Sequence, residues 1–112
     1  MNQRKHARYL VEYTGSFLGE GITASGIILN LSVAGCRARS ERTFDRGELL
    51  QVLIDVPRYK TPLQVECAMV RWSRGQEFGM EFLGSPKDDQ QQLRELIRET
   101  EAASALRGDK KD

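Results

Sequence analysis

Two arginines near the start of the chain form a spaced pair of cations. Arg4 and Arg8 stand four positions apart in the polar, basic segment of residues 1–8. The planar guanidinium group of arginine can pair bidentately with a phosphate, which a lysine ammonium cannot do. The pair therefore indicates local binding of an anion, although such a pair also arises in an ordinary solvated tail.

A second polar group of residues falls between two predicted strands. Asn30, Ser32 and Gly35 follow the pattern Asn-x-Ser-x-x-Gly. Asn and Ser side chains hydrogen-bond to nearby backbone, and Gly adopts positive φ at no steric cost. Taken alone, this composition predicts a tight turn.

The elements that must position these residues are mostly strands. Apolar residues recur at every second position in several short stretches, which is the period of a strand with one buried face. This pattern predicts about six strands between residues 9 and 83, and the spacing of these strands fits a small antiparallel barrel or sandwich. Turns are predicted at residues 19–21, 32–35, 45–47 and 73–75.

One predicted strand changes its buried face. Its apolar positions run through Leu63, Val65, Cys67 and Met69, and then pass to the opposite side at residues 68–72. Such a switch suits a strand that bends around a barrel or crosses between sheets. Within it, Trp72 either packs at an end of the barrel, which we favour, or stacks on an aromatic ring of a ligand.

The last part of the chain reads as a helix over residues 86–107. Ser85 is suited to cap it and Pro86 to occupy its first turn. Leu93, Leu96 and Ile97 lie on one helical face. We therefore predict one domain over residues 1–107, formed by a flexible arm (1–8), a β-barrel (9–83) and this helix, with a solvated tail at 108–112.

Composition excludes several classes of protein. The chain has 112 residues and a formal net charge of +1, so it lacks the broad cationic surface that duplex nucleic acid requires. No stretch is apolar enough to cross a bilayer, and no apolar segment follows the basic start. We expect a cytoplasmic protein without membrane insertion.

Enzyme chemistry also lacks its usual residues. His6 is the only histidine, and the sequence has no Gly-x-Ser-x-Gly elbow and no phosphate loop ending in Lys. Cys36 and Cys67 stand alone in apolar surroundings, which favours buried thiols over a disulfide or a metal site. We expect a binding module with no catalytic residues, no metal and no cofactor.

The two polar motifs, taken together and in this order, resemble those of the PilZ family of bacterial cyclic di-GMP receptor domains. The family pattern is Arg-x-x-x-Arg followed by Asp/Asn-x-Ser-x-x-Gly. Later segments, at residues 70–72 and 78–82, also resemble the family's closing hairpin. The resemblance implies a six-stranded antiparallel split barrel with a C-terminal helix, and a cyclic di-GMP site formed by Arg4, Arg8, Asn30, Ser32 and Gly35.

The resemblance also implies a mechanism. The arm would become ordered over the ligand on a fixed polar platform, where Asn30 reads a guanine edge and Ser32 donates to a phosphate or supports the turn. Gly35 would allow a sharp bend where a side chain would obstruct the ligand. The new surface would alter contact with a downstream protein, in motility, adhesion or exopolysaccharide control.

Two other functions stay open at this stage. One is a ligand-independent adaptor with the same fold, and the other, ranked lower, is a barrel that binds single-stranded nucleic acid. Among single residues, Arg37 and Arg39 point outward beside the second motif, where they either add charge to the site or form a solvated face. His6 lies between the arginines and is more simply read as exposed.

Overall fold

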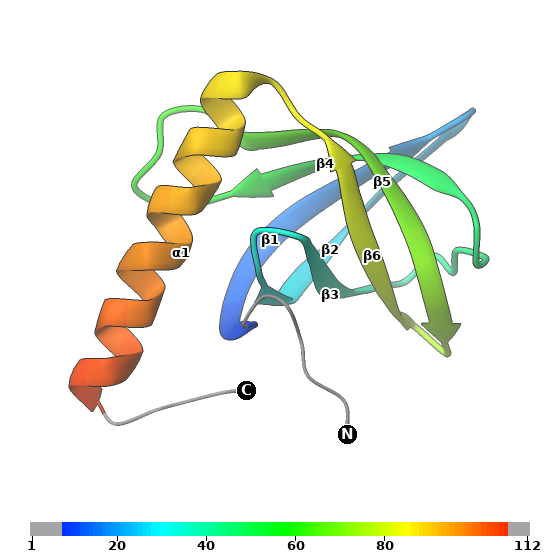
Figure 1. Ribbon diagram of the computed structural model, residues 1–112. Coiled ribbons are helices and arrows are strands. Elements are labelled where there is room, and N and C mark those ends of the chain that lie inside the picture. The colour runs from blue at the N-terminus through cyan, green and yellow to red at the C-terminus, as the bar shows by residue number, and fades with distance from the viewer. Residues whose placement is uncertain (1–7, 108–112) are drawn as a thin grey trace.

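Six antiparallel strands close into a barrel in the computed structural model, which describes residues 8–107, and one helix packs along its side (Figure 1). The order around the barrel is β1-β2-β3-β6-β5-β4. This confirms the predicted mainly β fold, a six-stranded antiparallel barrel with a C-terminal helix. The elements are β1 (Tyr9–Gly19), β2 (Ile22–Leu31), β3 (Gly35–Ser40), β4 (Leu49–Asp55), β5 (Leu63–Arg74), β6 (Glu77–Gly84) and α1 (Lys87–Arg107).

Three phenylalanine rings form the centre of the core. Phe17 from β1, Phe44 from the β3–β4 connection and Phe78 from β6 are almost fully buried. They meet edge to face, with ring centroids 5.1–6.3 Å apart. A buried side chain of this kind contributes about 1.5–3 kcal/mol through removal of apolar surface from water. The interior of the barrel is therefore mainly apolar.

The change of buried face in β5 has a local cause. The pairing of β5 with β6 is irregular between Cys67 and Ala68. Val65 is buried before this point, and Ala68 and Val70 are buried after it. A bulge shifts the alternation of buried and exposed side chains by one residue. This shift explains why the apolar positions of the strand change face in the sequence.

A second irregularity, between Val70 and Trp72, turns Trp72 to the outside of the barrel. The indole lies against Gly79 of β6, where an added Cβ would approach Trp72 Nε1 to 2.1 Å. Trp72 remains 37% exposed. It therefore packs, as predicted, but on the outer surface and not at a barrel end.

Helix α1 begins slightly later than the sequence predicts. Its first intrahelical bond runs from the backbone N–H of Gln90 to the carbonyl of Pro86, at 2.9 Å. Pro86 therefore stands at the cap of the helix and Ser85 just before it. The side-chain amide of Gln90 donates to the Ser85 carbonyl at 2.8 Å, which satisfies a further backbone group at this end.

The helix is attached to the barrel by apolar and polar contacts. Leu93 and Leu96 are buried in the common core. Asp89 Oδ2 accepts a hydrogen bond from the backbone N–H of Gln64 on β5, at 2.7 Å. The first half of α1 is thereby fixed against the strands.

Other expected features concern thiols, metals and membranes. Cys36 is buried and Cys67 half-buried, and both are free thiols. Within residues 8–107, no cluster of His, Cys, Asp and Glu is arranged to hold a metal ion. Within the same residues, no helix is both long and apolar enough to cross a membrane.

Candidate ligand-binding site

The turn between β2 and β3 is built around the Ser32 hydroxyl. Ser32 Oγ accepts hydrogen bonds from the backbone N–H groups of Ala34, at 3.0 Å, and Gly35, at 3.1 Å. The hydroxyl also donates to the Gly35 carbonyl at 3.3 Å, and Ser32 is only 1% exposed. Of the two roles that the sequence left open for Ser32, these contacts favour support of the turn.

Asn30 stands at the end of β2, half-buried on the outer surface. Its Oδ1 accepts a hydrogen bond from the backbone N–H of Arg37 on β3, at 3.0 Å. The carboxamide is therefore held with its oxygen toward the sheet. The Nδ2 group is the donor that this orientation offers to an acceptor above the surface.

Gly35 is needed for a reason that the sequence did not predict. Its backbone is not in the positive-φ region, which is adopted by Gly21, Gly47 and Gly75. A Cβ on Gly35 would lie 2.2 Å from the carbonyl oxygen of Met80 on β6. The expectation of a sharp, glycine-specific bend is therefore corrected: Gly35 permits close approach of β3 to β6.

The arginine pair falls at the edge of the described chain. Arg4 lies outside the described residues, as does His6. Arg8 immediately precedes β1, whose first residue, Tyr9, is paired with Leu31 just before the turn. The positive charge of Arg8 partly opposes the burial that raises the pKa of the Cys36 thiol to about 12. Since Cys36 follows Gly35 in β3, Arg8 lies close to the turn motif.

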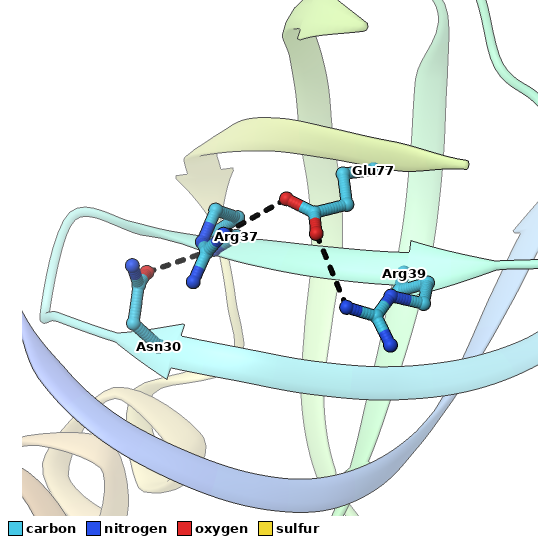
Figure 2. Close-up of polar contacts among 4 residues, drawn as sticks. All are labelled: Asn30, Arg37, Arg39 and Glu77. Carbon is cyan, nitrogen blue, oxygen red and sulfur yellow. Dashed lines mark hydrogen bonds and ion pairs between the residues drawn. The ribbon is translucent and has the colours of Figure 1, made fainter. Parts of the chain in front are cut away.

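A group of three charged residues begins next to Asn30 with Arg37, its partner across the β2–β3 pair. For Arg37 and Arg39 the sequence left open a place in the site or on a solvated face, and it gave no role to Glu77. Figure 2 shows Glu77 of β6 between Arg37 and Arg39 of β3. Arg37 Nη1 is 2.8 Å from Glu77 Oε1, and Arg39 Nη2 is 3.2 Å from Glu77 Oε2. The hydrogen bond from Arg39, with the charge and hydrogen bond of Arg37, lowers the pKa of Glu77 despite partial desolvation. We call these residues the Arg37–Glu77–Arg39 cluster.

The sequence pattern predicts the positions of the two arginines of this cluster but not that of its carboxylate. The alternation around Arg37 and Arg39 predicts that both point outward, and they do. Their partner Glu77 lies 40 and 38 residues further along the chain. It is brought to them by the pairing of β3 with β6, and a strand pattern predicts which face a residue occupies but not which strand lies next to it.

A shallow hollow extends from the cluster over the outer surface of β2 and β3. Its volume is about 710 Å³. The lining is mostly hydroxyl-bearing and charged, so it suits a polar ligand or a hydrated surface. The lining residues are Thr14, Thr23, Ala24, Ser25, Gly26, Ile27, Arg39, Ser40, Glu41, Arg42 and Gln76.

Comparison with known families decides the class of the domain. The family model described as "PilZ domain" matches residues 2–99. The chain belongs to the PilZ family. No curated protein matches this sequence.

Solved PilZ structures share the fold. The PilZ domain of YcgR from Escherichia coli with c-di-GMP has a TM-score of 0.75 and 15% identity, over 97% of this chain and 99% of that one. The inhibitor of motility MotI/DgrA from Bacillus subtilis has a TM-score of 0.69 and 22% identity. That match covers 88% of this chain and 52% of MotI, so the chain spans about half the length of MotI.

Polar and charged groups of this PilZ domain gather around the β2–β3 turn and the adjoining strands. Asn30 and Ser32 are held by the hydrogen bonds of the β2–β3 turn, and the cluster adds two guanidinium groups beside one carboxylate. PilZ domains are binding and adaptor domains. The cations and neutral donors suit recognition of an anionic, hydrogen-bonding ligand.

Proposed function

We propose that this PilZ domain is a receptor for cyclic di-GMP, with Arg4, Arg8, Asn30, Ser32 and Gly35 as its ligand-binding residues. The observation that carries the proposal is the position of Arg8, next to the strand pair that holds the Asn30–Gly35 turn. The YcgR PilZ domain, which has the same fold, was solved with c-di-GMP. Both observations favour a ligand between the arm and the turn.

The chemistry of the ligand matches these groups. Cyclic di-GMP carries two phosphates and two guanines. A guanidinium group can pair with a phosphate or with the O6/N7 edge of guanine, so Arg4 and Arg8 suit either part. Asn30 presents its Nδ2 donor, which suits a guanine acceptor, while Ser32 and Gly35 keep the turn in shape.

Ordering of residues 1–8 over the ligand would couple binding to signalling. Fixing the backbone costs about 1–2 kcal/mol per residue, and a hydrogen bond to a charged group returns about 1.5–3 kcal/mol. Several such bonds are therefore required.

The ordered arm and ligand then form a new surface for a downstream protein, and the likeness to MotI supports a partner in motility control. Such a receptor would act in the bacterial cytoplasm without catalysis.

Calorimetric titration of the full chain with cyclic di-GMP tests the proposal. GTP and a short single-stranded RNA serve as comparison ligands. We expect binding to cyclic di-GMP alone, and loss of measurable binding in R4A and in R8A. R46A, which removes an exposed arginine from the β3–β4 connection, is the matched control and should bind like the wild type.

Two results would contradict the proposal. Unchanged affinity in both R4A and R8A would remove the arginine pair from the site. No heat and no amide shifts with cyclic di-GMP, from a folded protein, would favour the ligand-independent adaptor. Preferential binding of the RNA would favour a single-stranded nucleic acid function.

A further inference from the structure

The Arg37–Glu77–Arg39 cluster contains two cations for one anion, directly beside the proposed ligand platform. We propose that Arg37 is a further ligand contact, and that Glu77 is the carboxylate that the ligand's phosphate displaces from it. This inference rests on the proposed function. It assigns the cluster a role in setting how tightly the anion binds.

The position of Arg37 carries the first step. Arg37 and Asn30 are direct partners across the β2–β3 pair, so their side chains leave the sheet on the same face. The backbone of Arg37 is also fixed by its hydrogen bond to Asn30 Oδ1, at 3.0 Å. A ligand that meets Asn30 Nδ2 therefore lies within reach of the Arg37 guanidinium.

Arg39 occupies a different place on the same strand. Two residues along a strand correspond to about 6.6 Å, so Arg39 lies one step further from Asn30. It holds Glu77 through the other carboxylate oxygen, Oε2. This arrangement assigns Arg37 to the ligand and Arg39 to Glu77.

The exchange is chemically balanced because phosphate and carboxylate are equivalent partners for a guanidinium group. Both accept its paired N–H groups. When the phosphate takes the place of Glu77 Oε1, Glu77 keeps its hydrogen bond from Arg39. The Glu77 side chain is 31% exposed, so water solvates the oxygen that is released. The exchange leaves no buried unpaired charge.

Glu77 should weaken ligand binding for two reasons. It competes with the phosphate for Arg37, and its negative charge repels the ligand. Since all three side chains are partly exposed, at 34%, 52% and 31% for Arg37, Arg39 and Glu77, each effect is screened by water. Removing the charge should therefore raise affinity by about 2- to 5-fold at low salt, the size of an exposed ion pair.

Titration of the full chain with cyclic di-GMP at low salt tests the exchange. We expect E77Q to bind about 2- to 5-fold tighter, and R37A to bind at least about 10-fold weaker through loss of a charge-assisted hydrogen bond. R37K keeps the charge but not the planar fork, so it should also bind more weakly. In the double variant R37A/E77Q, most of the gain from E77Q should disappear.

Matched controls separate local effects from net charge. E66Q removes an exposed carboxylate from β5 and R46A an exposed arginine from the β3–β4 connection, so both should bind like the wild type. Urea unfolding of every variant establishes that each is folded under the titration conditions. If R37A is not folded under these conditions, R37K tests the role of Arg37 in its place.

The outcomes distinguish this inference from the function on which it rests. A wild-type protein that does not bind cyclic di-GMP would contradict the proposed function itself. Wild-type binding that is unchanged in R37A and R37K would overturn only the role of Arg37. Weaker binding in E77Q would show that Glu77 positions Arg37 for the ligand, and would overturn the displacement.

Discussion

The Asn30 side chain and the Arg37 backbone are joined across β2 and β3 by a hydrogen bond of 3.0 Å. The pairing of these strands is irregular between Ile28 and Asn30. The Asn30 oxygen thus supplies an acceptor where the backbone ladder is interrupted. One residue of the turn motif therefore both stabilises the sheet and presents an amide donor to the outside.

Substitution of Asn30 tests its structural role separately from ligand binding. N30A leaves the partly buried N–H of Arg37 without this acceptor, so the free energy of unfolding should fall by about 0.5–1.5 kcal/mol. N30D keeps an oxygen in the same place and should unfold within about 0.5 kcal/mol of the wild type. Urea unfolding monitored by fluorescence gives both values. An equal loss in the two variants would argue that the Asn30 oxygen is not the stabilising group.

Substitution of Ser32 should have a larger effect, because its hydroxyl organises the whole turn. S32A removes the acceptor for two backbone N–H groups, those of Ala34 and Gly35. We expect a loss of about 1–3 kcal/mol in unfolding free energy, and faster amide hydrogen exchange at these two positions. S73A, at an exposed position of β5, is the control. Unchanged exchange in S32A would contradict the role of the hydroxyl.

The fold could be predicted because each strand buries one face. In β4 the alternation of Leu50, Val52 and Ile54 is directly visible in the sequence, and all three are buried. The face change in β5 was also predictable, since the bulge at Cys67 and Ala68 shifts the apolar pattern by one residue.

The site was less predictable because it depends on which strands are neighbours. The turn motif is local, so Asn30 and Ser32 could be identified as turn residues from their types and spacing. Glu77 could not be assigned, because it lies 40 positions after Arg37 and 38 positions after Arg39, and only the pairing of β3 with β6 brings it to them. The reason for Gly35 was also missed, since the carbonyl of Met80 approaches it only through that same pairing.

Substitution of Gly35 tests the close approach of β3 to β6. In G35A the new Cβ would lie 2.2 Å from the Met80 carbonyl oxygen, whereas a Cβ on Gly84 would have nothing within 4 Å. Since the obstructing atom belongs to the backbone, the strands must move apart. We expect G35A to cost about 1–3 kcal/mol, as for overpacking of an interior, while G84A is nearly neutral. Thermal unfolding of both variants checks this, and a neutral G35A would contradict the steric explanation.

The Cys36 thiol should be inert in the folded protein. Burial raises its pKa to about 12, partly opposed by Arg8, and the thiolate is the reactive form. In the unfolded chain a thiol ionises near pH 8.5, so the contribution of Cys36 to stability is complete below that pH. It is lost as the pH rises toward about 12, because the unfolded state releases its proton first.

Alkylation with iodoacetamide at pH 8, followed by mass spectrometry, measures this protection. We expect Cys36 to be labelled in urea but not in the native protein, whereas the half-buried Cys67 serves as the internal comparison. Between pH 8 and pH 10.5, the wild type should lose more unfolding free energy than C36A, since only the wild type carries this thiol. Equal labelling rates of Cys36 with and without urea would show that the start of β3 opens readily. That result would contradict the proposal that the strands beside Asn30 form a rigid platform for the ligand.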